Sequence, residues 1–177
     1  MKLTWFDGTT IRIHIGGAIV VIDPDHAPLH IDRFELVSGA DQVIAGFGLS
    51  LPQADPATWR PRKPLRLLDD TGAPPEIIAA SAGAGTILID AMGEPPLLLL
   101  SDQAPELGRW ADYAIIVLFG DGATLTGMGR ALLAASPPRL LVLAADEAAA
   151  DQTFSALRDK LDGTGLVALQ PGMALEV

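Results

Sequence analysis

The first 24 residues show an alternation that strongly restricts the fold, because it predicts a run of closely paired β-strands. Ile11, Ile13 and Ile15 are separated by single polar residues, which is the period-two pattern of a strand with one buried face. The two glycines at positions 16–17 can supply the positive φ that a two-residue hairpin turn requires. Residues 18–22 are all apolar, as in a strand buried on both faces. The N-terminus is therefore predicted to be strand, loop, strand, tight turn and strand.

Further along, short apolar runs alternate with turns and with two helical patterns. The runs that predict buried strands lie at residues 86–90, 96–100, 113–119 and 140–143. Residues 126–136 predict a helix that two prolines stop, and Asp146 is predicted to cap a second helix that runs to Leu161. The glycines at 120–122 and 127–129 are interpreted as turn and helix-entry residues. Residues 165–177 predict strand, Pro-Gly turn and strand.

Composition excludes several classes of protein. The chain has 177 residues, enough for one domain with a core, so we expect residues 1–177 to form a single domain. Cysteine is absent, which excludes disulfides, cysteine-bound zinc and thiol catalysis. The net charge of −10 argues against a nucleic-acid partner. The apolar runs are too short to span a membrane, and the N-terminus lacks a leader pattern, so no membrane association and a cytoplasmic location are expected.

The opening block resembles the start of the metallo-β-lactamase fold superfamily, in particular the branch that contains L-ascorbate-6-phosphate lactonase. Proteins of that branch open with a Lys-Ile-Thr-Trp-Leu-Gly-His type strand and a hairpin that ends in Ile-Asp-Pro. The matching residues here are Lys2-Leu3-Thr4-Trp5-Phe6, followed by Asp7-Gly8 in place of Gly-His, and later Ile22-Asp23-Pro24. The resemblance implies an α/β (α+β) fold, a four-layered αβ/βα sandwich with its two sheets face to face. Because the chain is short for the family, we expect peripheral helices to be missing, above all between Leu51 and Pro75.

The same resemblance implies a metal site whose ligands this chain lacks. In the family a strand ends in His-x-His-x-Asp-His, and these donors hold one or two zinc-type ions while leaving a position open for water. Counted from Asp41, the four ligand positions fall on Phe47, Leu49, Leu51 and Pro52. Later family ligands fall near Ser81 or Ala82, at Asp102, which is retained, and at Ala145. We therefore expect no metal, no cofactor and no catalytic residue, but a vestigial pocket made by Asp7, Asp23, Phe47, Leu49, Leu51 and Asp102.

The three histidines offer little chemistry. His14 lies on the polar side of an alternating strand and is interpreted as a surface residue. His26 and His30 are four residues apart beside several carboxylates and could form a replacement metal site. That site needs a helix, which neighbouring prolines oppose, so the segment is interpreted as a loop with polar tips. Asp23 is predicted to cap backbone amides beneath the pocket.

Two functions remain open. The first, which we favour, is a non-catalytic binding or interaction module with an unknown small-molecule or protein partner. The second is a metal-dependent hydrolase of a small phosphoester, lactone or similar substrate that uses a relocated site at Asp7, His26, His30 or Asp102. The high apolar content of a small chain whose active-site cover is trimmed also predicts a twofold homodimer. The basic residues at 60–66, beside Trp59, are interpreted as a solvated loop within an irregular surface segment at 52–70.

Overall fold

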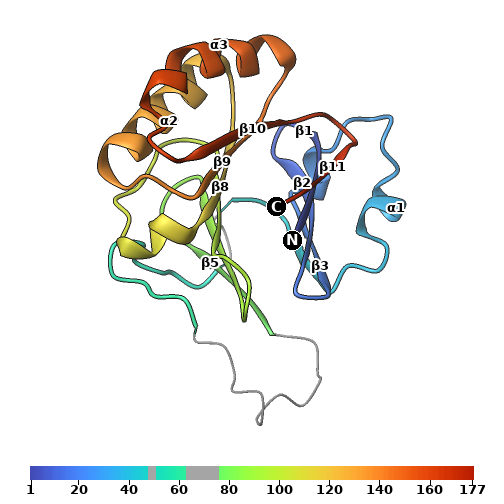
Figure 1. Cartoon of the computed structure of the whole chain (residues 1–177). Coiled ribbons are helices and arrows are strands. Elements are labelled where there is room, and N and C mark those ends of the chain that lie inside the picture. Colours follow the sequence, from blue (N-terminus) through green and yellow to red (C-terminus); the bar gives the residue numbers. More distant parts are fainter. Residues whose placement is uncertain (48–50, 63–75) are drawn as a thin grey trace.

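The computed structural model describes residues 1–47, 51–62 and 76–177, and it shows a mixed α/β chain with two sheets (Figure 1). The five-stranded sheet has the order β11-β1-β2-β3-β4 and the six-stranded sheet the order β10-β9-β8-β7-β6-β5. The strands are β1 (Lys2–Asp7), β2 (Thr10–Ile15), β3 (Ala18–Ile22), β4 (Gln42–Ile44), β5 (Ile77–Ser81), β6 (Thr86–Ala91), β7 (Leu97–Leu100), β8 (Ile115–Phe119), β9 (Leu140–Ala144), β10 (Gly165–Leu169) and β11 (Ala174–Glu176). The helices are α1 (Arg33–Val37), α2 (Gly122–Ala135) and α3 (Glu147–Leu157), with 3₁₀ turns η1 (Pro24–His26), η2 (Arg109–Tyr113) and η3 (Arg158–Lys160).

Both sheets mix parallel and antiparallel strands. β1, β2 and β3 form an antiparallel meander, and its second turn has Gly16 at φ 57° and Gly17 at φ 85°, which confirms the predicted hairpin. β4 returns parallel to β3. In the other sheet β7, β8, β9 and β10 run parallel to one another, whereas β5 and β6 are antiparallel to their neighbours. The carboxyl ends of four parallel strands therefore meet at one edge of this sheet.

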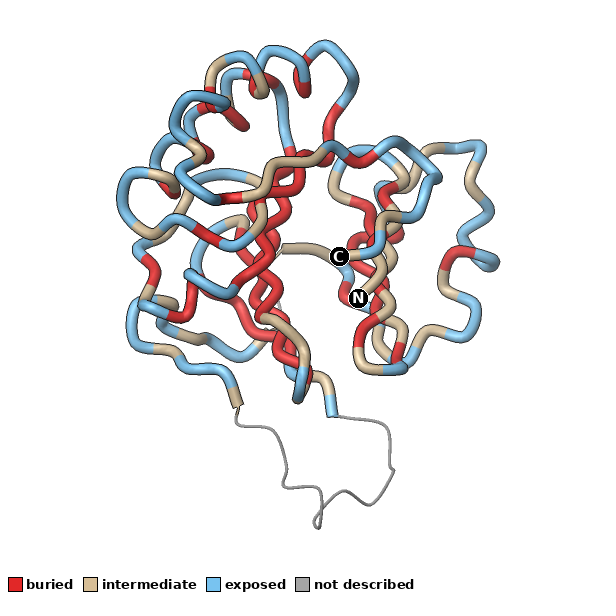
Figure 2. Tube along the Cα trace, viewed as in Figure 1, coloured by how far each residue is buried: buried red, intermediate tan, exposed pale blue. Residues whose placement is uncertain are grey.

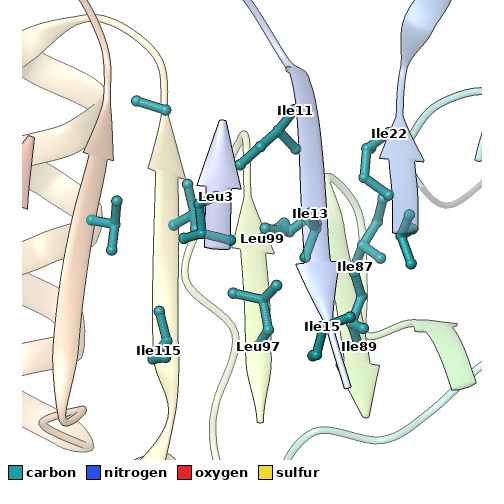
Figure 3. Close-up of a cluster of buried hydrophobic side chains, with 14 of the residues drawn as sticks. Leu3, Ile11, Ile13, Ile15, Ile22, Ile87, Ile89, Leu97, Leu99 and Ile115 are labelled. Carbon is teal, nitrogen blue, oxygen red and sulfur yellow. The ribbon is translucent and has the colours of Figure 1, made fainter. Parts of the chain in front are cut away.

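A single buried cluster joins the two sheets, since side chains of both take part in it (Figure 3). Ile11, Ile13 and Ile15 contribute from β2, and each is at most 1% exposed. From the other sheet β6 and β7 contribute alternate residues, including Ile87 and Leu97. Burial of each such side chain stabilises the fold by about 1.5–3 kcal/mol. The buried residues concentrate along both sheets in Figure 2, so the period-two pattern of the sequence correctly identifies this core.

A second cluster fills the space between the six-stranded sheet and helices α2 and α3. The two helices approach closely, because a Cβ at Gly129 would lie 2.4 Å from Cδ1 of Leu157. The prediction that the first helix begins at residue 126 is wrong: it begins at Gly122, capped by Asp121, and residues 127–129 lie inside it. The second helix is capped by Asp146 as predicted but ends at Leu157, and η3 replaces its predicted last turn.

Among the described residues, the short helix α1 is the one helix on the outer face of the five-stranded sheet. Its cap is Asp32, whose carboxylate accepts from the backbone amides of Phe34 and Glu35. Arg12 on β2 donates to the carbonyl of Leu36 and, at 2.9 Å, to that of Ser38, which fastens the segment to the sheet. Within the described residues no helix has the length and apolar character needed to cross a membrane.

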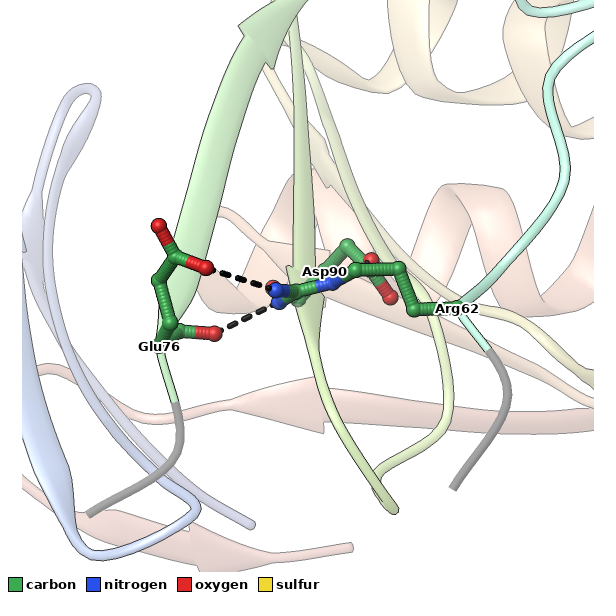
Figure 4. A network of polar contacts seen from close by, with 3 residues as sticks. All are labelled: Arg62, Glu76 and Asp90. Carbon is green, nitrogen blue, oxygen red and sulfur yellow. Dashed lines mark hydrogen bonds and ion pairs between the residues drawn. The ribbon is translucent and has the colours of Figure 1, made fainter. Parts of the chain in front are cut away.

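Residues 51–62 are irregular, as predicted, but they are not a loop that only contacts solvent. The amide of Ala54 donates to the carbonyl of Ser81 at 2.8 Å, at the outer edge of β5. Trp59 lies edge-on to Trp110, with 4.9 Å between ring centroids. Arg62 binds the carboxylate of Asp90 on β6 (Figure 4). The interpretation of the basic stretch as solvated is therefore wrong for Arg62; residues 63–66 of that stretch lie outside the described part.

Candidate functional site

A cleft of about 370 Å³ lies at the carboxyl ends of the parallel strands β7, β8 and β9, next to the turn between β1 and β2. Ligands of open α/β sheets bind at this end of the strands. The polar groups around the cleft are Asp7, Thr9, Ser101, Asp121 and Asp146. They come from four separate segments, so the fold rather than local sequence brings them together.

The floor of the cleft is apolar. Trp5, Phe119, Ala144 and Ala145 line it, and each is at most 7% exposed. Phe47 supports this floor from outside, edge-on to Phe119 with 5.8 Å between ring centroids. An aromatic and methyl-lined floor beneath a polar rim suits a small ligand with one apolar and one polar side.

Each carboxylate of the rim also binds a backbone amide. Asp121 accepts from Thr124 and Asp146 accepts from Ala149, both at 2.8 Å, as N-caps of α2 and α3. The hydrogen bond from the Thr124 amide lowers the pKa of Asp121. Asp7 accepts from the amide of Gly8 at 2.7 Å. All three acids thus have a structural task in addition to any contact with a ligand.

Asp7 occupies an unusual backbone conformation. Its φ is 111°, and the register of β1 and β2 shifts between Trp5 and Asp7. A non-glycine residue at such a φ is strained by about 1–3 kcal/mol, and strain of this kind concentrates at functional sites. The strained residue lies on the rim of the cleft, which is a second reason to regard the cleft as the functional site.

Asp23 lies beneath the rim and does not cap amides, so that prediction is wrong. Its side chain accepts from the Thr9 hydroxyl, and its Oδ1 lies 2.6 Å from Nδ1 of His26. The carboxylate is buried, whereas the His26 ring is 75% exposed. The hydrogen bond to Asp23, aided by its charge, raises the pKa of His26. A left-handed φ of 52° at Asp23 turns the chain so that the two side chains meet.

The structure brings only part of the predicted pocket together. Asp7 and the predicted ligand position Ala145 line the cleft, while Phe47 supports its floor. Asp102 is exposed and does not line the cleft, although its neighbour Ser101 does. Leu51 is partly buried against the core between the sheets, and Leu49 lies outside the described residues.

The remaining predicted positions lie apart from the cleft. Ser81 and Ala82 are buried at the end of β5, and the carbonyl of Pro52 accepts from the amide of Ser81. His30 is exposed in the loop before α1. His14 lies on β2 opposite Lys2, and partial burial together with the charges of Lys2 and Arg12 lowers its pKa.

Sequence reasoning missed Thr9, Ser101 and Asp121. The position of Asp121 could have been predicted from the sequence, because an aspartate three residues before Thr124 at the start of a helical pattern is typical of a helix N-cap. Across the described residues, no three His, Asp or Glu side chains are placed to hold one metal ion. Comparisons with protein-family models, with curated proteins and with solved structures return no match.

Proposed function

We propose that this chain is a trimmed protein of the metallo-β-lactamase fold that binds a ligand or partner without catalysis. The support for the fold is the opening strand pattern, two mixed sheets around one core, and α2 and α3 outside one sheet. In this proposal α1 is the remnant of the fourth layer. Peripheral helices are expected to be missing above all between Leu51 and Pro75; residues 51–62 contain no helix, and residues 63–75 lie outside the described part of the chain.

The observation that carries the binding function is the composition of the cleft. Its floor is apolar, and each of its three carboxylates is held by a backbone amide. A general base or nucleophile needs a free lone pair aimed at a reacting atom and a partner that orients it. Carboxylates that are held in place by backbone amides instead give the cleft a constant negative rim, which suits the binding of a ligand.

The ligand class follows from the same chemistry. The cleft offers an aromatic floor, two hydroxyls and three carboxylates, on a chain with a net charge of −10. A small organic cation with an apolar body, such as an aromatic amine, matches both sides. The size of the cleft, about 370 Å³, lies within the usual range for small-molecule sites.

Phenethylamine is a suitable probe, and phenylacetate is its control with reversed charge. The indole Nε1 of Trp5 donates to the carbonyl of Gly8 at 3.0 Å, and both residues line the cleft. The NMR signal of the Trp5 indole N–H therefore reports directly on whether a ligand occupies the cleft. We expect the amine to shift this signal with saturation and phenylacetate to leave it in place. Ala145→Leu should fill the cleft and abolish the shift, whereas Ala134→Leu on the exposed face of α2 should not. A shift that survives Ala145→Leu would contradict binding in the cleft.

The hydrolase remains the second candidate because of the pair formed by Asp23 and His26. A buried carboxylate on Nδ1 leaves Nε2 of an exposed imidazole available as a base, which is how many catalytic histidines are oriented. Metal analysis of purified protein and turnover of para-nitrophenyl phosphate and acetate separate the two candidates. The binding proposal predicts substoichiometric metal and no turnover. One equivalent of zinc, or turnover lost in His26→Ala or Asp102→Ala, would establish the hydrolase instead.

A further inference from the structure

A second hollow lies between helix α3 and strand β10, beside the cleft; we call it the α3–β10 groove. Its volume is about 640 Å³. Ala150 and Phe154 line it from the helix, and Ala168 and Leu169 from the strand. The two elements run along the same side of the molecule in Figure 1. The side chains named here make the walls of the groove apolar, so its open side requires an explanation.

One wall of the groove is a free sheet edge. β10 is the last strand of its sheet and pairs only with β9, in parallel. The amide of Gly165 donates to the carbonyl of Arg139 at 3.0 Å, so residues 165, 167 and 169 face β9. The amides and carbonyls of Leu166 and Ala168 consequently point outward, and within the described residues neither amide donates to another backbone carbonyl. The strand Gly165–Leu169 contains no charge and no proline, the usual devices that prevent pairing at an edge.

In the described part of the chain every charged residue that lines the groove is acidic, and Gln170 adds a neutral polar side chain. Asp146, Glu147 and Asp151 line the groove, and no basic residue does. Asp146 caps α3, but Glu147 and Asp151 are exposed and form no ion pair in the described part of the chain. They are four residues apart on one helix face, an arrangement of like charges that weakens a helix. A cation bound between them would relieve that repulsion.

We propose that the α3–β10 groove binds an extended segment of a partner protein that alternates basic and apolar residues and adds as a strand to β10. The backbone of the segment would bond to Leu166 and Ala168, its apolar side chains would pack against Phe154, and its basic side chains would reach Glu147 and Asp151. A second copy of this chain fits less well, since pairing β10 with β10 would bring two acidic rims together on chains of net charge −10. The inference rests on the proposed role as an interaction module; the groove shares Ala145 and Asp146 with the cleft, but the proposed contacts are made by β10 and by Glu147, Asp151 and Phe154 of α3, which do not line the cleft.

The test uses the full chain and a fluorescein-labelled synthetic peptide of about nine alternating valine and lysine residues. We expect saturable binding by fluorescence anisotropy, with NMR shifts centred on the amides of Leu166 and Ala168. The same peptide with glutamate in place of lysine should not bind. Glu147→Gln combined with Asp151→Asn should weaken binding about tenfold or more. The matched control is Glu106→Gln with Asp112→Asn, which removes two exposed charges elsewhere and should leave the affinity within about twofold.

Strand addition itself is tested at Ala168. The amide of Ala168 points away from β9, so Ala168→Pro should fold normally and yet abolish binding, while Ala168→Val keeps the amide and should bind. Circular dichroism and the melting temperature check that both variants are folded. If Ala168→Pro does not fold, hydrogen exchange of the wild type tests strand addition instead: the peptide should protect the Ala168 amide from exchange. Any of three results would overturn the proposal. The peptide binds Ala168→Pro as well as the wild type, the peptide does not bind the wild type at millimolar concentration, or the wild type forms a dimer that Ala168→Pro dissociates. None of these results depends on metal content or on the cleft probe, so the two proposals can fail separately.

Discussion

Replacing Arg62 by methionine would leave a buried carboxylate without its cation. Arg62 donates from Nε to Oδ2 of Asp90 at 2.6 Å and from Nη2 to the carbonyl of Asp90 at 2.8 Å (Figure 4). The Asp90 side chain is only 7% exposed, that of Arg62 is 24% exposed, and that of Glu76 is 80% exposed. Arg62 also donates to the Glu76 carboxylate at 3.3 Å and to the Glu76 carbonyl at 2.5 Å (Figure 4), but the Glu76 side chain is exposed, so the pair with Asp90 determines most of the result.

The magnitude follows from this burial. Removing one partner of a fully buried ion pair costs about 3–5 kcal/mol, because the other charge remains in an apolar environment. Water reaches part of the Arg62 guanidinium, so we expect the lower end, about 3 kcal/mol, for Arg62→Met. Removing both partners, as Arg62→Met with Asp90→Val, should cost only about 1 kcal/mol, because no charge is then left behind. For a chain of this length the single variant should melt about 6–12 °C lower.

Urea unfolding followed by tryptophan fluorescence measures these free energies, since Trp59 and Trp110 pack together beside the same segment. A cost below about 1 kcal/mol for Arg62→Met, or equal costs for the single and double variants, would refute the assignment of a buried ion pair.

Four further outcomes are expected. Phe47→Ala should lower stability by about 2 kcal/mol, less than the 3–5 kcal/mol of a fully buried ring because Phe47 is only partly buried; a neutral result in urea unfolding would show that its edge-on contact contributes nothing. Gly129→Ala should destabilise by about 1–3 kcal/mol through its clash with α3, whereas Gly127→Ala, which has open space, should stabilise slightly. The NMR titration midpoint of His26 should lie above 6.5 and return toward it in Asp23→Asn; stability from this pair is present below 6.5 and is lost as the pH rises through the folded pKa. Light scattering should report a twofold dimer, and a monomer at high concentration would remove that proposal.

Most strands could be predicted because their signal is local, although β5 was not predicted and the strand predicted at residues 113–119 begins only at Ile115, after the turn η2. The alternation of Ile11, Ile13 and Ile15, the paired glycines and the apolar runs each specify a strand or a turn without reference to distant residues. The start of α2 could not, since glycine is a poor helix former. Gly122 and Gly129 are tolerated in α2 because α3 lies against them, with the side chains of Gln152 and Leu157 where a Cβ would be. Because this reason lies in the packing of two helices, it cannot be read from a local stretch of sequence.

The site was harder because neighbouring residues point in opposite directions. The prediction chose Asp102, but the chain after β7 turns Ser101 toward the cleft and leaves Asp102 in solvent. A shift of one residue in an extended segment exchanges the two faces, and counting along a resemblance cannot fix positions to that accuracy. Asp7, the last residue of β1, does line the cleft, although the register of β1 and β2 shifts just before it.

The positions of the aspartates in the structure explain part of the acidic composition of the chain. Most of the aspartates among the described residues bind a backbone amide, a hydroxyl or an arginine, and these include Asp7, Asp23, Asp32, Asp41, Asp55, Asp90, Asp121 and Asp146. The net charge of −10 therefore arises in part from residues that cap helices and turns, and it says little about a partner by itself. Glu147 and Asp151 differ, because they lie exposed on one face of α3 beside a free strand edge and have no such task in the described structure. Exposed acidic residues that form no ion pair in the described structure are the ones whose charge a partner can use, which is why the test of function begins at the α3–β10 groove as well as in the cleft.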